Sequence, residues 1–375
     1  MIDEGRRALL VGGVAGAAGT WLASAASRGS TEEASVRQDA AQASGARDAV
    51  KRTLELPGLV DLQVNGFAGV DFNDPALGEE QVARAVEAIG RTGVTRFLPT
   101  LVTSSDESFT ACARRLARVR HPAIAGLHLE GPYISPEDGY RGAHPRAFVR
   151  PADVDDFRRR QDAAGGRIRI VTLAPEVPGA LPLVEHLVRT GVHVAIGHTG
   201  ASGAQIQDAV EAGATLSTHL GNGCAAMMPR HPNVIWEQLG EDRLLASFIV
   251  DGHHLPPATV KAMFRAKTPA RTILVTDAIA AAGMPPGRYV LGGQTVELEP
   301  SGRVAALGTP YLAGSALRLD AAIGNAVRFT GLPLEEVVAM ASTRPAAYLG
   351  IEPAGKLTAE WDPESAKLTV RRVAI

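Results

Sequence analysis

The chain has 375 residues, of which 45% are hydrophobic and 21% are charged, and its formal net charge is -2. This composition is typical of a soluble globular protein, and the interspersed charges do not indicate binding to nucleic acid or to an anionic membrane surface. The only two cysteines, Cys112 and Cys224, cannot form a disulfide framework and are compatible with a reducing compartment.

The N-terminal segment differs from the rest of the chain. Residues 8–26 carry no charge and follow Arg6 and Arg7, which is compatible with an export signal of the twin-arginine kind or with a membrane anchor. Asp3 and Glu4 argue against both, and a poorly ordered extension or an incorrectly assigned start is the alternative. Residues 27–50 are polar and lack periodicity, so we assign residues 1–50 to an N-terminal segment and linker.

From residue 57 onwards, short β-branched runs alternate with amphipathic helical patterns. Strands followed by helices predict right-handed crossovers and a parallel sheet. Eight such strands predict an α/β fold, a (β/α)8 barrel of the TIM type, over residues 51–350. An open doubly wound sheet is the alternative, but residues 65–69 match its glycine-rich phosphate turn poorly. The predicted strands are 59–64, 95–100, 123–130, 167–174, 192–197, 214–219, 244–250 and 272–277, and helical patterns include 79–93, 183–191 and 203–213.

Beyond the eighth strand the pattern changes again. Residues 287–307 predict a hairpin insertion with a Gly-Gly turn, followed by helices near 317–330 and 334–343. The tail, residues 351–375, has strand-like ends and predicts a small β subdomain. Such a subdomain usually needs more strands than this tail offers, and the first fifty residues do not obviously supply them.

In a barrel of this kind the active site lies at the carboxyl ends of the strands. Seven of the eight predicted strands end in, or run into, a titratable, metal-ligating or amide side chain, which gathers these groups at one rim. In chain order they are Gln63 and Asn65, His128 and Glu130, Glu176, His198, His219, Asp251 with His253 and His254, and Asp277.

Three of these residues predict a metal site. A lone histidine at a strand end is more often a hydrogen-bonded core or rim residue than a ligand. Together, however, Glu130, His198 and His219 offer two imidazoles and a carboxylate, a set that suits Zn2+ or a similar divalent ion and leaves a position open for water. His128 has the same strand phase as Glu130 and is a candidate for a supporting role behind the ligands.

Asp277 ends the last strand and has two interpretations. It could cap a helix beginning at residue 278. Alternatively, it is a general acid/base that accepts a proton from the attacking water and returns it to a leaving amine, at a site where a metal lowers the pKa of water and polarises the scissile carbonyl.

These motifs resemble the N-acetylglucosamine-6-phosphate deacetylases of the amidohydrolase superfamily, in the family's order over roughly residues 57–350. The shared segments are "PGLVDLQVNG" (57–66), "FLPTLVTSS" (97–105), "GLHLEGPYIS" (126–135), "GAHP" (142–145), "TLAPE" (172–176), "GHT" (197–199), "THLGNG" (218–223), "DGHHL" (251–255), "VTDA" (275–278) and "AGSAL" (313–317).

The resemblance implies a role for each matching residue. Glu130, His198 and His219 correspond to the metal ligands and Asp277 to the catalytic acid/base. Further positions correspond to substrate contacts: His144 and His254 to residues that contact the sugar, with His254 also placed to polarise the amide carbonyl, and Asn222, Gly223 and Arg230 to residues at the phosphate. In relatives that arginine reaches into the neighbouring subunit's site, which implies a homodimer.

Gln63 and Asn65 decide the expected number of metals. Relatives with His-x-His on the first strand hold two metals and those with Gln-x-Asn hold one, and an amide can brace the site but is a poor ligand. We therefore expect one divalent ion per subunit, Zn2+ first, with Fe2+, Mn2+ and Co2+ as alternatives.

The expected function is metal-dependent hydrolysis of the N-acetyl group of N-acetylglucosamine 6-phosphate, giving glucosamine 6-phosphate and acetate in the cytoplasm. Residues 221–236 depart from the family's usual phosphate loop, so the alternative substrates are another N-acetylhexosamine or its phosphate and an N-acyl amino acid. A non-catalytic barrel would lack a ligand or the acid, yet all four residues are present. An exported protein remains the alternative for localisation, because of residues 1–26.

Overall fold

We describe the protein from a computed structural model, which covers residues 50–291, 294–308 and 312–374. The expectations for the N-terminal segment and for the Gly-Gly turn at residues 292–293 lie outside the described residues. Among the described residues, no helix is both long enough and apolar enough to cross a membrane.

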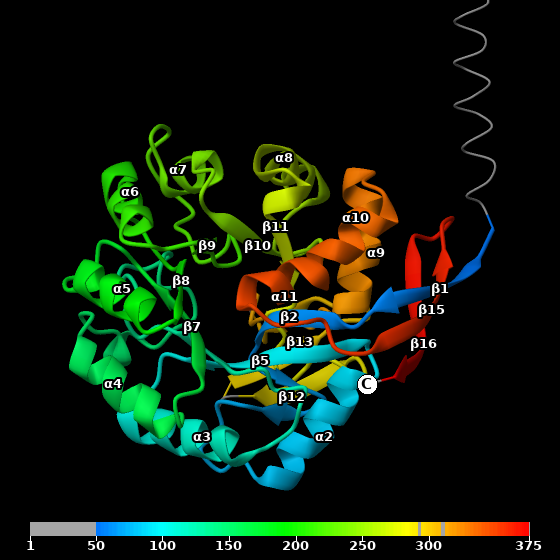
Figure 1. Ribbon diagram of the computed structural model, residues 1–375, viewed down its shortest axis with the longest axis horizontal. Helices are drawn as coiled ribbons and strands as arrows, with labels where there is room; N and C mark the ends of the chain where they lie inside the picture. The colour runs from blue at the N-terminus through cyan, green and yellow to red at the C-terminus, as the bar shows by residue number, and fades with distance from the viewer. Residues whose placement is uncertain (1–49, 292–293, 309–311, 375) are drawn as a thin grey trace, which may run out of the picture. The chain divides into compact units, whose positions relative to one another are not determined.

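The predicted barrel is confirmed. Eight parallel strands follow one another around the sheet in chain order, each hydrogen-bonded to the next (Figure 1). The strands are almost entirely buried and contribute many Val, Ile, Leu and Ala side chains to the core. Six strands are shorter than predicted, two of them by half or more, since the runs at 123–130 and 214–219 form strands only over their last four and middle two residues. The barrel strands are β2 (Leu59–Val64), β5 (Val94–Val102), β6 (Leu127–Glu130), β7 (Ile168–Leu173), β8 (His193–Ile196), β9 (Leu216–Ser217), β10 (Leu245–Ile249) and β11 (Thr272–Val275).

The first and last strands meet at the rim where the site lies. The backbone N–H of Asp277 donates to the Gln63 carbonyl over 3.0 Å, and that of Asn65 donates to the Ala278 carbonyl over 2.8 Å. Below them, the buried Asp61 carboxylate accepts the Thr276 hydroxyl at 2.6 Å. These contacts bring β2 and β11 together although more than 200 residues separate them in the sequence.

Helices cover the outside of the barrel (Figure 1). Each buries one apolar face, and several begin at a polar cap: α6, for example, begins at a Ser202–Gln205 capping box and buries Ile206, Ala209 and Val210. The helices are α2 (Glu79–Gly90), α3 (Asp106–Arg118), α4 (Val154–Ala163), α5 (Ala180–Arg189), α6 (Gly203–Glu211), α7 (Val234–Gly240), α8 (Pro257–Lys267), α9 (Leu319–Thr330), α10 (Leu334–Met340) and α11 (Thr343–Leu349).

The C-terminal tail forms a three-stranded antiparallel sheet with a strand from the other end of the described chain. β1 (Arg52–Pro57) pairs with β15 (Lys356–Asp362), which pairs with β16 (Lys367–Ala374). The third strand therefore comes from residues that precede the barrel, within the range assigned to the barrel by the sequence. Alternate side chains of β15 are buried, so one face of the sheet packs inwards.

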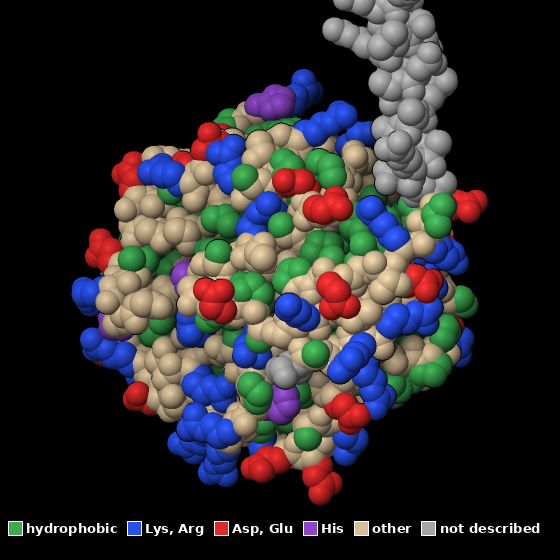
Figure 2. All heavy atoms as spheres, turned by 45° about the vertical axis from the view of Figure 1, so that its right-hand side comes forward, with side chains coloured by type: hydrophobic (Ala, Val, Ile, Leu, Met, Phe, Trp, Pro, Cys, Tyr) green, Lys and Arg blue, Asp and Glu red, His purple; other side chains and the backbone are tan. Residues whose placement is uncertain are grey.

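The insertion after the eighth strand is a second three-stranded sheet and not a two-stranded hairpin. It comprises β12 (Gly287–Leu291), β13 (Gln294–Leu298) and β14 (Val304–Ala306), and Val296, Leu298 and Val304 pack on Ala281. A short ribbon, β3 (Gly66–Phe67) with β4 (Val70–Asp71), follows the first barrel strand. On the face drawn in Figure 2, acidic and basic side chains are interspersed.

Candidate active site

The side chains of Glu130, His198 and His219 converge at the carboxyl ends of β6, β8 and β9. His219 Nε2 lies 2.9 Å from Glu130 Oε1, His198 Nε2 lies 3.3 Å from the same oxygen, and the two Nε2 atoms are 3.2 Å apart. All three residues are buried. The three strand ends thus place two imidazole nitrogens and a carboxylate oxygen at the corners of one small triangle.

This triangle has the size that a metal ion requires. Bonds of about 2.0–2.1 Å in a tetrahedral Zn2+ site place neighbouring ligand atoms roughly 3.3 Å apart, close to the 2.9, 3.2 and 3.3 Å observed. Three protein ligands leave a fourth position for water or substrate, which is the arrangement of a catalytic site. The residues present therefore fit a divalent metal ion.

The orientation of the His198 ring is fixed from several sides. Its Nδ1 donates to the Tyr140 carbonyl over 3.0 Å, which leaves the Nε2 lone pair for a ligand. Gly223 and Gly142 both have positive φ, and a Cβ on either would lie within 2.7 or 3.1 Å of the ring. Only glycine allows the backbone to approach the imidazole this closely at these two positions.

Three of the candidate site residues have a strained backbone conformation. His198, His219 and Asp277 have φ of 51°, 29° and 48°, in the left-handed region that costs non-glycine residues about 1–2 kcal/mol each. Hydrogen bonds from the neighbouring strands offset this cost: the Ser247 hydroxyl accepts the His219 N–H at 2.8 Å, and the Gln63 carbonyl accepts that of Asp277. The left-handed conformation follows directly after β8, β9 and β11, and it directs these three side chains into the mouth of the barrel.

The electrostatics of the cluster favour an ionised Glu130. Burial alone would raise the pKa of Glu130, but the adjacent imidazoles of His198 and His219 hold it well below its usual range. Burial likewise disfavours the charged form of His219, but the Glu130 hydrogen bond raises its pKa. The cluster therefore carries a carboxylate charge that a metal ion would neutralise.

Asp277 faces the same cluster and is held by the two amides of the first strand. Its Oδ1 accepts Asn65 Nδ2 at 2.6 Å and Gln63 Nε2 at 3.0 Å, and Gln63 Nε2 also donates to Glu130 Oε1 at 2.9 Å. Burial and then the negative charge of Glu130 raise the pKa of Asp277. No helix begins at residue 278, so the alternative role of Asp277 as a helix cap does not apply.

His144 lies beside the cluster without entering the triangle. Its Nδ1 contacts the Thr103 hydroxyl at 2.8 Å, and its Nε2 is 3.9 Å from Glu130 Oε2. Glu130, His144 and His198 thus form a wider set of potential ligands, within 4.8 Å of one another. The set with His219 is the tighter of the two. Burial lowers the pKa of His144 to about 3, so its neutral ring is suited to hydrogen bonding with a substrate hydroxyl.

His128 occupies the barrel interior beneath the site. Its Nδ1 donates to the Leu62 carbonyl at 3.1 Å and its Nε2 accepts from the Thr172 hydroxyl at 2.7 Å. Both ring nitrogens are therefore engaged inside the barrel. Burial lowers the pKa of His128 to about 4, which keeps the ring neutral.

On the seventh strand's loop, Asp251 organises the two histidines that follow it. Its Oδ2 accepts His254 Nδ1 at 2.6 Å, and its Oδ1 accepts the backbone N–H groups of His253 and His254 at 2.8 Å. This arrangement fixes the His254 ring and leaves Nε2 for other contacts. His253 instead contacts the Ser301 carbonyl of the insertion.

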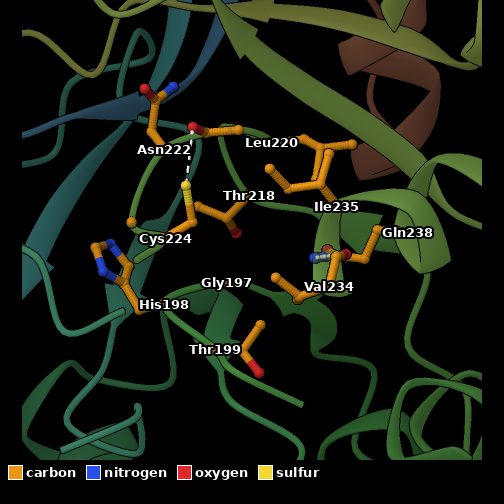
Figure 3. Close-up of a pocket in the computed structure, with 12 residues that line it drawn as sticks. Gly197, His198, Thr199, Thr218, Leu220, Asn222, Cys224, Val234, Ile235 and Gln238 are labelled. Atoms are coloured by element: carbon orange, nitrogen blue, oxygen red, sulfur yellow. Dashed lines mark hydrogen bonds between the residues drawn. The ribbon is translucent and has the colours of Figure 1, made fainter. Parts of the chain in front are cut away.

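The segment assigned to the phosphate lies between β9 and α7. Asn222 and Gly223 border a cavity of about 10 Å³, room for about one water molecule, with His198 on one side and Ile235 of α7 on another (Figure 3). Asn222 Nδ2 donates to the His219 carbonyl at 3.2 Å, which ties this loop to a ligand. Arg230 is exposed, and its guanidinium forms no ion pair with any residue in the described ranges.

Part of the site gave no signal in the sequence. The Tyr140 carbonyl that orients His198 is a backbone group, which no side-chain pattern identifies. The dual hydrogen bond of Gln63 to Glu130 and Asp277 is equally invisible before the strands close into a barrel.

Known proteins match the chain over this region. Residues 55–364 match the model of the amidohydrolase family. An N-acetylglucosamine-6-phosphate deacetylase from Lysinibacillus sphaericus is 36% identical, over 83% of this chain and 80% of the relative, and an N-acetylgalactosamine-6-phosphate deacetylase from Escherichia coli O157:H7 is 35% identical, over 79% and 78%.

A solved structure agrees with both. The N-acetyl-D-glucosamine-6-phosphate deacetylase from Mycobacterium smegmatis superposes with a TM-score of 0.78 at 34% identity, covering 86% of each chain. The barrel, the cluster at its rim and these matches together show that the chain belongs to the amidohydrolase family, in the group that contains the N-acetylglucosamine-6-phosphate deacetylases.

Proposed function

We propose that the protein hydrolyses the N-acetyl group of N-acetylglucosamine 6-phosphate, giving glucosamine 6-phosphate and acetate. The observation that carries this proposal is the triangle of Glu130, His198 and His219 with Asp277 beside it, in a chain whose relatives bear the name of this activity.

One divalent ion, Zn2+ first, would be held by Glu130, His198 and His219, with Fe2+, Mn2+ and Co2+ as alternatives. When bound, the ion supplies a lowered pKa for water and a polarised carbonyl. Gln63 supports the binding of a single metal ion. Its side-chain nitrogen lies between the carboxylates of Glu130 and Asp277, where an N–H group is attracted and a carbonyl oxygen would be repelled. In this orientation the amide is a donor and not a ligand.

Asp277 is the proposed acid/base. Its raised pKa and its position against the ligands suit it to accept a proton from the attacking water. The water oxygen first bonds to the carbonyl carbon, giving a tetrahedral adduct. The C–N bond then breaks as Asp277 passes the same proton to the leaving amine nitrogen. Asn65 and Gln63 hold the carboxylate in place during both transfers, so no separate acid is required.

We assign substrate binding to five residues around this centre. His144 and His254 would contact the sugar, and the Asp251 hydrogen bond fixes the His254 ring for its proposed place at the amide carbonyl. Asn222, Gly223 and Arg230 would contact the phosphate. Because the Arg230 guanidinium is exposed and forms no ion pair within the described part of the chain, it is available to a neighbouring subunit, and this supports a homodimer.

We propose a cytoplasmic location, because the phosphorylated sugar is expected to be a cytosolic substrate. An export function for the N-terminal segment, residues 1–26, would instead accompany an unphosphorylated substrate.

The test is acetate release by the Zn2+-loaded protein from N-acetylglucosamine 6-phosphate, from N-acetylgalactosamine 6-phosphate and from unphosphorylated N-acetylglucosamine. We expect the phosphorylated sugars to react far faster. Arg230→Ala should reduce kcat/KM for the phosphorylated sugar roughly 10- to 100-fold, the equivalent of a lost charge-assisted contact, and leave the unphosphorylated sugar almost unchanged. Arg114→Ala, on the exposed face of α3, is the matched control.

Equal loss on both sugars would overturn the phosphate assignment of Arg230. Absence of acetate release from all three sugars, with Zn2+ bound, would overturn the proposed activity.

A further inference from the structure

Glu176, just beyond β7, is joined to the segment that carries His198. One carboxylate oxygen, Oε2, accepts the Thr199 hydroxyl at 2.5 Å, and the other, Oε1, accepts the Gly200 N–H at 2.7 Å. Both oxygens are therefore used by the two residues that directly follow His198. The sequence placed Glu176 at the rim, but the proposed reaction gives it no task.

The segment after His198 needs such an anchor. β8 ends at Ile196, and His198 then adopts a φ of 51°, which an ordinary side chain rarely adopts. The Thr199 hydroxyl that donates to Glu176 also accepts the Ala201 N–H at 3.0 Å, so the carboxylate, the hydroxyl and the backbone form one turn.

The same turn touches the group that orients the imidazole. A Cβ on Gly200 would lie 2.7 Å from the Tyr140 ring, so the Gly200 backbone packs directly against Tyr140. The Tyr140 carbonyl accepts His198 Nδ1 at 3.0 Å. Glu176 thus acts on the imidazole from two directions, through the backbone that follows His198 and through the residue that receives its N–H.

We infer that Glu176 is a positioning residue for the metal site: it fixes the direction of His198 Nε2 toward Glu130 and His219 without touching the reacting groups. The inference rests on the proposed function, because it takes His198 as a ligand. Hydrogen-bonding partners behind metal ligands typically change metal affinity about 10- to 100-fold when they are removed.

The experiment compares Glu176→Ala, Glu176→Gln and the unchanged protein. Zn2+ affinity is measured by competition with a chromophoric chelator, the visible absorption of the Co2+-substituted protein reports the ligand geometry, and thermal unfolding of the metal-free protein reports the fold. Glu241→Ala is the matched control, because Glu241 accepts the Arg243 N–H at 2.9 Å in a loop outside the site.

We expect Glu176→Ala to bind Zn2+ about 10- to 100-fold more weakly and to show an altered Co2+ spectrum, while melting within a few degrees of Glu241→Ala. Glu176→Gln should recover most of the affinity, since its amide oxygen can accept the Gly200 N–H and its amide nitrogen can donate to the Thr199 hydroxyl.

Wild-type affinity and an unchanged Co2+ spectrum in Glu176→Ala would overturn the inference. So would a loss of affinity in both Glu176 variants that is accompanied by melting far below the control, because the carboxylate would then only hold the fold. If the unchanged protein itself binds neither Zn2+ nor Co2+, the metal site of the proposed function fails instead.

Discussion

Replacing Asp277 with asparagine separates the acid/base role of this residue from its structural role. The asparagine oxygen can accept the same two hydrogen bonds, from Asn65 at 2.6 Å and Gln63 at 3.0 Å, while the amide nitrogen takes the place of the second carboxylate oxygen. Asparagine also tolerates the φ of 48° at this position. The fold and the arrangement of the metal ligands should therefore be retained.

The expected loss lies in turnover. A positioned general acid/base contributes about 10²- to 10⁴-fold to rate, or roughly 2.7–5.5 kcal/mol of transition-state stabilisation. Because the raised pKa of Asp277 suits it to exchange a proton near neutral pH, and an amide cannot, we expect kcat to fall by at least 10²-fold with KM changed little.

The assay measures kcat and KM for acetate release, bound Zn2+ and the melting temperature of Asp277→Asn. Asp74→Asn is the control: Asp74 is exposed and its carboxylate accepts the Ala76 N–H of its own turn, at 2.8 Å. A kcat within tenfold of the unchanged protein, at full Zn2+ content, would refute the acid/base assignment.

Three further predictions concern the ligands and the stability of the barrel. Glu130→Gln should lower Zn2+ affinity at least ~100-fold, because the amide removes the charge that faces both imidazoles; full metal content after gel filtration would contradict this. Asp156→Ala should cost about 2–5 kcal/mol in urea unfolding, because the buried Arg160 Nε–H and the buried Tyr133 hydroxyl lose their acceptor, at 2.9 and 2.8 Å, although Asp106 still pairs with Arg160. Exposed Asp155→Ala should cost little. Burial, and then the positive charge of Arg271, lowers the pKa of Lys267 to about 8, so the folded protein loses this proton at a lower pH than the unfolded chain. The free energy of unfolding of the unchanged protein, relative to that of Lys267→Met, should therefore rise by about 3 kcal/mol between pH 8 and pH 10.5. A difference that stays constant over this pH range would be inconsistent with the lowered pKa.

The sequence was sufficient for the order of the elements and for the side of the barrel on which chemistry occurs. Runs such as "TILV" are apolar because parallel strands are covered on both faces, and their regular alternation with helices leaves few topologies. Since all eight strands point the same way, the polar residue after each strand must reach the same rim. This reasoning placed Glu130, His198, His219 and Asp277 together before any contact was known.

Strand lengths and partners depended on the tertiary structure. The strand predicted over residues 123–130 begins only at Leu127, although residues 123–125 are also apolar, because hydrogen bonding to the neighbouring strands and not hydrophobicity sets its limits. β1 finds its partner, β15, some 300 residues away, and a short amphipathic run such as Arg52–Pro57 gives no indication of so distant a pairing.

The sequence by itself determined which chemical groups reach the rim, because strand direction and side-chain type are local properties. The tertiary structure alone decided how those groups meet. The left-handed backbone at His198 and His219, the amide of Gln63 between two carboxylates and the hold of Glu176 on the segment after His198 all depend on contacts between strands that are distant in the chain. Such contacts exist only when the barrel closes, so no local pattern encodes them.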